Sequence, residues 1–122
     1  DLIGQEYAGL VSVPAYSIQG EPSACNAGNN GLDLFRMMDQ RQVVSITAAD
    51  HCDFESPTDF ICELNCEGDS ADFSDEEINI AITMLATAAI VSFTDGYEDA
   101  SIVWTNEGIE SWAIEGIVNK VE

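Results

Sequence analysis

Apolar residues gather into two short runs in the first half of the chain, and an amphipathic stretch lies between them. The first run, over residues 11–19, is β-rich, and Pro14 within it suits the start of a strand better than its middle. A loop of turn-forming residues follows, and apolar residues then recur at helical spacing over 32–40. The second run, over 43–48, is again β-branched. This order predicts a βαβ unit with two parallel strands and a right-handed crossover.

Two helix starts are recognisable in the second half of the chain. Ser56 and Pro57 are residue types that favour the N-cap and the first helical position, and they predict a helix that runs to about Cys66. Ser74 and Glu77 have the spacing of a capping box and predict a second, longer helix.

The longer helix, expected over residues 75–94, is apolar on nearly every side. Such a helix is expected to be packed on both sides. Residues 116–121 could add a terminal strand. No internal repeat, low-complexity segment or linker separates these elements, so residues 1–122 are expected to form a single unit of the α/β class.

The charge of the chain is strongly one-sided. Three Lys and Arg residues stand against 23 Asp and Glu, for a formal net charge of −20. This charge repels phosphate backbones, which argues against nucleic acid as a partner. Because the acids are spread along the whole chain, they indicate a solvating surface suited to saline water rather than a metal site. The densest run, over 67–77, lacks the spacing of a calcium-binding loop.

The chain has four cysteines but only one histidine, and the cysteine spacing is wrong for a zinc site. An even number of cysteines in a short chain favours disulfides and therefore a secreted or periplasmic protein. Four cysteines allow three pairings, among which sequence alone does not choose. The chain starts with Asp1, which fits a trimmed N-terminus, and no segment is apolar enough for a membrane span.

The lone histidine, His51, is the strongest candidate for a functional residue. It comes three residues after the second expected strand. In open α/β sheets, ligands and catalytic groups collect beyond the carboxyl ends of the strands. Asp50, Asp53 and Glu55 lie close to it in the sequence, and an imidazole oriented by a carboxylate is suited to act as a general base. The alternative is a histidine without function in an acidic surface loop.

Two segments of the chain resemble the C-terminal part of an α/β-hydrolase. They are V-P-A-Y-S-I-Q-G-E-P-S-A-C-N, over 13–26, and A-A-D-H-C-D-F-E-S-P-T-D, over 48–59. The likeness is greatest to the esterase branch that includes cutinase-like, chlorophyllase-like and platelet-activating-factor acetylhydrolase-like enzymes, and it covers about residues 11–95. It implies the last parallel strands and packing helices of an α/β-hydrolase sheet, incomplete on their own.

The resemblance gives His51 the role of the histidine of a Ser-His-acid triad, with Asp53 and Phe54 matching the residues that usually follow it. The position where the family places the triad acid is Ser23 here, which cannot carry the charge. We take Glu21, in the same loop, as the provisional acid; the remaining candidates are Asp33, Asp53 and an acid upstream of this chain. Asn26 is expected to shape this loop, and no cofactor is needed.

The resemblance also implies a serine nucleophile, which this sequence does not supply. No G-x-S-x-G motif occurs in the chain, and Ser17 lies within an expected strand rather than at a strand-to-helix turn. We therefore expect a C-terminal hydrolase segment whose partner is an upstream segment with the nucleophile, acting on a small-molecule or polymer ester. The alternative is a non-catalytic acidic α/β domain that binds a partner or a cation.

The expected strands also suggest a pairing of the cysteines. Cys25 and Cys52 each follow a strand at the same edge of the sheet, and a bond between them would join the two loops. Cys62 and Cys66 are four residues apart on one helix face. The hypothesis is therefore Cys25–Cys52 and Cys62–Cys66.

Overall fold

The fold is a small three-stranded sheet with helices on both of its faces. The computed structural model describes residues 5–47, 49–55, 60–66, 73–111 and 116–120. The elements, in chain order, are α1 (Gln5–Ala8), β1 (Ala15–Gln19), α2 (Gly31–Phe35), β2 (Arg41–Ile46), the 3₁₀ helix η1 (Cys52–Phe54), α3 (Phe60–Cys66), α4 (Asp75–Ser92), the 3₁₀ helix η2 (Glu98–Trp104), α5 (Asn106–Ser111) and β3 (Val118–Lys120).

The sheet has the order β1-β2-β3. β1 and β2 are parallel, with Ala15 opposite Arg41 and Gln19 opposite Ser45. This confirms the predicted parallel pair, and β1 begins directly after Pro14, whose nitrogen cannot donate to a neighbouring strand. β3 confirms the predicted terminal strand and pairs antiparallel with β2.

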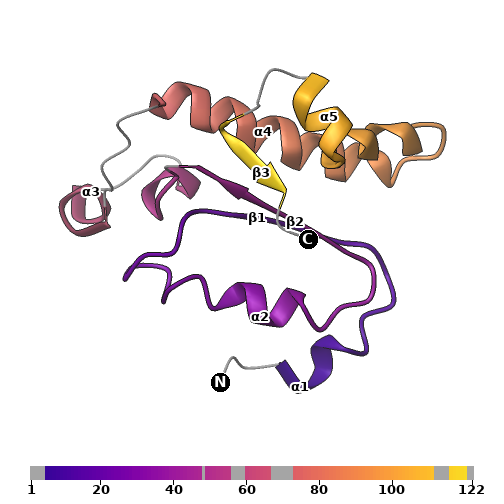
Figure 1. The fold of residues 1–122 in the computed structure, drawn as a ribbon, viewed down its shortest axis with the longest axis horizontal. Helices are drawn as coiled ribbons and strands as arrows, with labels where there is room; N and C mark the ends of the chain where they lie inside the picture. Colours follow the sequence, from indigo (N-terminus) through magenta and orange to yellow (C-terminus); the bar gives the residue numbers. More distant parts are fainter. Residues whose placement is uncertain (1–4, 48, 56–59, 67–72, 112–115, 121–122) are drawn as a thin grey trace.

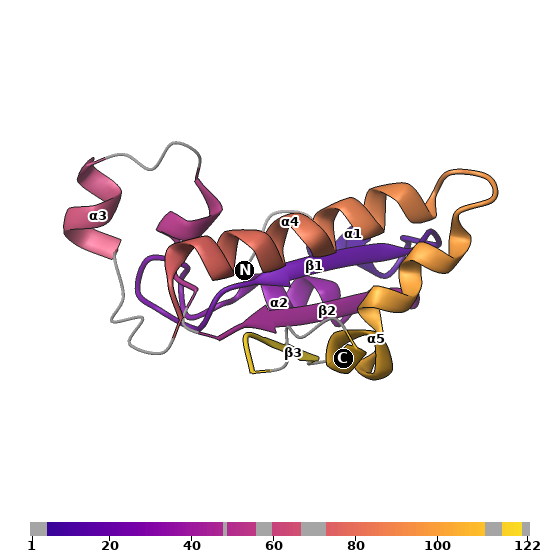
Figure 2. The ribbon, with the colours of Figure 1, turned by 90° about the horizontal axis from the view of Figure 1, so that it is seen from above.

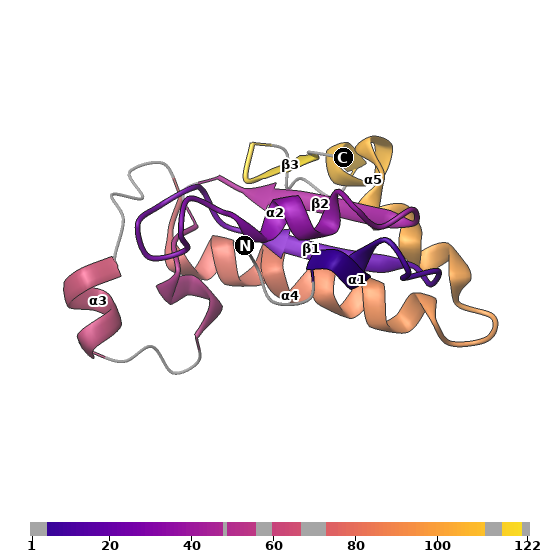
Figure 3. The same cartoon turned by 90° about the horizontal axis from the view of Figure 1, so that it is seen from below.

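Helices cover the sheet on both faces. α4 lies along one face, and α1 and α2 lie on the other (Figure 1). Figure 2, from above, has α4 in front of β1, and Figure 3, from below, has α1 and α2 in front of the strands. Val43 and Val44 are both buried although they point to opposite faces of β2. Burial on both faces is what a parallel pair between two helical layers requires.

The main core lies between the sheet and α4. Its fully buried side chains include Ile46, Leu85 and Trp104. The Trp104 indole Nε1 donates a hydrogen bond of 3.0 Å to the Leu85 carbonyl oxygen, so the one polar atom of this large side chain is satisfied inside the core.

The start of α4 follows the sequence, but its packing does not. The capping box of Ser74 and Glu77 is present, as predicted. The expectation that the helix is packed on both sides is wrong for the described residues. Ile80 and Ile90 are 54% and 71% exposed, and the buried residues of α4 all lie on the side that meets the sheet and η2. The reason is geometric: a three-stranded sheet presents one surface to α4, and no described element covers the opposite side.

The predicted cysteine pairing is also wrong. Cys52 is bonded to Cys62, with their Cα atoms 5.7 Å apart, which excludes both Cys25–Cys52 and Cys62–Cys66. The bond joins α3 to η1, a contact that no local pattern in the sequence predicted. Cys25 is also disulfide-bonded, and no described cysteine is free.

The helix α3 occupies the predicted position up to Cys66, although its expected cap, Ser56 and Pro57, falls outside the described residues. Among the described helices, none has the length and apolar character needed to cross a bilayer.

Candidate functional site

The loops that leave β1 and β2 meet at the carboxyl end of the sheet. The backbone N–H of Glu21 donates to the Ala49 carbonyl oxygen at 3.0 Å. Gly20 makes this approach possible, because a Cβ at this position would lie 2.5 Å from the same oxygen and 3.2 Å from Cε2 of Phe54. The sequence predicted that the two exit loops lie side by side, and this contact confirms it.

The loop after β1 is held in shape by Asn26. Its Oδ1 accepts hydrogen bonds from the backbone N–H groups of Ser23 at 2.8 Å and Asn29 at 2.9 Å. Its Nδ2 donates to the Glu21 carbonyl oxygen at 2.7 Å. This satisfies three backbone groups in a segment without secondary structure. The prediction that Asn26 shapes the loop is confirmed.

The loop after β2 is held by its own acids. Asp53 Oδ2 accepts from the Asp50 backbone N–H at 2.8 Å, and Asp50 Oδ1 accepts from the Cys52 backbone N–H at 2.6 Å. These bonds start η1 and fix the backbone on both sides of His51. Because the Asp53 carboxylate accepts this backbone hydrogen bond, its contribution is to hold the loop backbone that carries the imidazole.

His51 lies at the N-cap of η1 with its imidazole half exposed. Nε2 lies 3.7 Å from Oε1 of Glu55, four residues further along the chain, and the two form an ion pair when the imidazole is protonated. His51 also lines a hollow of about 320 Å³ between the two exit loops. Other residues around this hollow are Gln19, Gly20, Asn26, Asn29 and Asp50.

The predicted acid, Glu21, has an exposed side chain that is not paired with His51. Its backbone, however, is tied to Ala49, two residues before the histidine. Asp33 lies in α2, 3.3 Å from the guanidinium of Arg36. Glu55 is therefore the described acid next to the imidazole. The four-residue spacing between His51 and Glu55 was visible in the sequence. It did not distinguish Glu55 from Asp50 and Asp53, which lie even closer to the histidine along the chain.

Sequence reasoning did not single out Gln19. This side chain is buried at the end of β1, and its Nε2 donates to Ser17 Oγ at 2.9 Å. Its Oε1 is buried and accepts no hydrogen bond from the described residues. Gln19 lines the same hollow as His51, and its amide oxygen is a buried acceptor that the described residues leave unused.

The described residues contain no group of three or more His, Cys, Asp or Glu side chains that could hold a metal ion. What the hollow offers is an accessible imidazole, amide groups and carboxylates, which suit proton transfer and hydrogen bonding.

Comparisons with protein-family models, with characterised proteins and with solved structures give no match for this chain.

Proposed function

We propose that this chain is the histidine-bearing part of a carboxylic ester hydrolase that works by Ser-His-acid acyl transfer. The observation that carries the proposal is the position of His51: it follows the carboxyl end of a buried parallel strand and lies next to the exit loop of the neighbouring strand. The fold itself is a small mixed sheet with helices, and the assignment to the α/β-hydrolases rests on the sequence resemblance together with this position.

In this mechanism the imidazole moves two protons. It accepts one from a serine hydroxyl as the oxygen attacks the ester carbonyl carbon, and it returns one to the leaving alcohol. The cycle repeats with water to release the acid. A half-exposed imidazole beside a hollow has room for both the hydroxyl and the ester. No cofactor takes part.

The orienting acid is assigned to Glu21, with Glu55 as its competitor. Glu21 extends from a backbone already bonded to the loop that carries the histidine. Glu55 is already 3.7 Å from the imidazole. Glu21 belongs to the loop after the neighbouring strand β1, whereas Glu55 belongs to the same loop as His51.

The nucleophile and oxyanion hole belong to an upstream segment in this proposal. β1 is an edge strand of the described sheet, so a further strand can pair with its free side. Tyr7, Leu10 and Val13, just before β1, are exposed apolar side chains that such a segment would cover. The Cys52–Cys62 disulfide is consistent with a secreted or periplasmic protein.

The first test is genetic. We expect the reading frame upstream of Asp1 to continue and to encode a G-x-S-x-G motif between a strand and a helix. A stop codon or a start codon directly before Asp1 in the transcript would end the proposal.

The second test is enzymatic and uses the complete reading frame. His51→Ala is expected to lower kcat for a p-nitrophenyl ester by roughly 10³-fold or more, because the serine loses its base. Glu107→Gln, an exposed acid on α5, serves as the matched control and should leave kcat unchanged. Equal activity of the His51→Ala enzyme and the wild type would contradict the proposal.

The same assay separates the two acids. Glu21→Gln should lower kcat by roughly 10²-fold to 10⁴-fold if this carboxylate orients the imidazole. A loss seen with Glu55→Gln and not with Glu21→Gln would move the role to Glu55 and leave the reaction class unchanged.

The alternative function, a non-catalytic acidic domain that binds a partner protein, is favoured by a different observation. A large apolar surface on α4 is left uncovered by the described residues. If only this alternative holds, neither the wild type nor the His51→Ala variant hydrolyses the ester.

A further inference from the structure

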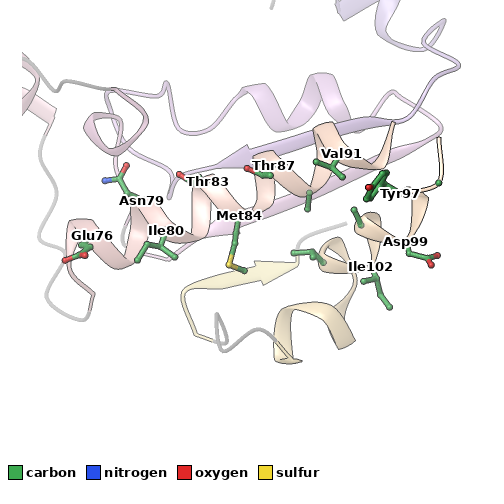
Figure 4. A pocket seen from close by; sticks show the side chains of 14 residues that line it. Glu76, Asn79, Ile80, Thr83, Met84, Thr87, Val91, Tyr97, Asp99 and Ile102 are labelled. Atoms are coloured by element: carbon green, nitrogen blue, oxygen red, sulfur yellow. The ribbon is translucent and has the colours of Figure 1, made fainter. Parts of the chain in front are cut away.

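A second hollow, of about 880 Å³, runs along α4 and shares none of its described lining residues with the hollow at His51. One wall is α4 and the other is the turn after it together with η2 (Figure 4). Met84 and Val103 form part of the floor, where the groove meets the main core. Glu76 and Ile80 lie at one end of the hollow, and Tyr97, Asp99 and Ile102 lie at the other (Figure 4).

The walls of this groove expose large apolar side chains to water. Ile80, Tyr97 and Ile102 are 54%, 61% and 55% exposed. Thr83 and Thr87 are the uncharged polar residues between them on α4. Isolated exposed apolar residues are ordinary, but a continuous apolar hollow of this size marks a binding surface.

The dimensions of the groove match one helix. Its α4 wall extends from Glu76 to Val91, fifteen steps along the chain, which at about 1.5 Å per residue gives about 22 Å. A partner helix of about four turns has this length. An amphipathic helix places its apolar side chains at i, i+3, i+4 and i+7 along one side, which suits an apolar groove that follows α4.

The acidic residues of the groove favour a partner with positive charge. Glu76 lies at one end and Asp99 at the other, with the apolar floor between them (Figure 4). The described residues that line the groove include no Lys or Arg. A second copy of this chain would bring another net charge of −20 to this surface, and an anionic membrane would be repelled in the same way.

We propose that this groove binds a basic amphipathic helix of a partner protein, with cationic residues near both helix ends and apolar residues between them. The partner's apolar stripe covers Ile80, Met84 and Ile102, and its cations approach Glu76 and Asp99. This inference uses no feature of the proposed catalytic site, so either can fail without the other.

The test uses a fluorescent 16-residue probe peptide with Leu at helical a and d positions and Lys at both ends. Fluorescence anisotropy with the whole chain should show saturable binding that weakens as NaCl rises from about 0.05 to 0.5 M. Ile80→Ser and Ile102→Ser should each weaken binding at least fivefold. Glu76→Gln with Asp99→Asn should reduce the dependence on salt.

Ile90→Ser is the matched control, because Ile90 is an exposed isoleucine of the same helix that does not line the groove. It should bind the probe as the wild type does, and circular dichroism should give unchanged melting for all three Ser variants. Since Ile80 and Ile102 are more than half exposed, their replacement leaves the core intact.

Four results would overturn the proposal. One is equal binding of a scrambled peptide of the same charge, and another is equal loss of binding in the Ile90→Ser variant. The third is no saturable binding of the probe. The fourth is self-association of the wild type that Ile80→Ser and Ile102→Ser abolish, since it would assign the groove to a second copy.

Discussion

At the scale of single residues, the candidate site depends on side chains that hold backbone rather than on side chains that react. Asn26 fixes the first exit loop through three hydrogen bonds, and Asp50 and Asp53 fix the second. Each bond satisfies a backbone group that no strand or helix would otherwise use. His51, with Glu55 3.7 Å from its Nε2, is the side chain to which we assign the proposed proton transfer.

Gly20 allows the two exit loops to touch, and its replacement should separate them. In Gly20→Ala, the new Cβ meets the Ala49 carbonyl oxygen, which belongs to backbone and cannot simply rotate away. We expect a loss of about 1–3 kcal/mol in the free energy of unfolding, measured by urea denaturation. Gly31→Ala is the control, since nothing lies within 4 Å of a Cβ there. A Gly20→Ala variant as stable as Gly31→Ala would show that the two loops are not held in contact.

At the scale of elements, α4 is fixed at its start by local chemistry. Backbone N–H and hydroxyl groups of Ser74 donate to Glu77 Oε2 at 2.8 Å and 2.7 Å. These two bonds hold the pKa of the Glu77 carboxyl below its usual 4.5. Because the folded state lowers this pKa, its contribution to stability is complete above about pH 4.5 and is lost as the pH falls through the lowered value.

Ser74→Ala should therefore have two effects. It removes an N-cap, at a cost of about 1 kcal/mol in the free energy of unfolding. It also removes one donor to the carboxylate, so the titration midpoint of Glu77, followed by carboxyl ¹³C NMR, should rise toward the usual value. Thr94→Ala, just beyond the end of α4, is the control for stability. An unchanged titration midpoint of Glu77 in the Ser74→Ala variant would contradict the hydrogen bond from the Ser74 hydroxyl to this carboxylate.

The connection between η1 and α3 is the second element-scale feature. The disulfide closes a short loop, with a sequence separation of 10 between Cys52 and Cys62. Replacing both residues by Ser should destabilise the chain by about 2–3 kcal/mol, as expected for a loop of this order. Peptide mapping without reduction should recover Cys52 linked to Cys62. Recovery of Cys25 linked to Cys52 would contradict this structure.

At the scale of the whole molecule, the two proposals rest on two surfaces that the described residues leave open. One is the free edge of β1, where the proposed upstream segment adds its strand. The other is the groove along α4, where the proposed partner helix binds. They lie on different elements, and the net charge of −20 affects them unequally. Strand pairing depends mainly on backbone hydrogen bonds, whereas the groove attracts a cationic partner.

The sequence by itself determined the parallel pair and the positions of β1, β2, α3, α4 and β3. It did not predict α1, η1, η2 or α5, and the helix expected over 32–40 is the shorter α2, which ends at Phe35. The β-branched runs around Ile18 and Val44, the proline before β1 and the Ser74 cap are local signals, each read within a few residues. The nearness of the two exit loops followed as well, because parallel strands end at the same edge of a sheet. His51 could be placed there for the same reason.

Only the tertiary structure decided which distant groups meet. It paired Cys52 with Cys62, put Glu55 rather than Glu21 next to the imidazole and buried Gln19. It also left Ile80 and Ile90 of α4 uncovered by the described residues. None of these can be read from periodicity, because each depends on the distance between side chains after the loops have folded. In an α/β chain with so many acids, local pattern fixes what each segment becomes, and packing fixes which neighbours it has.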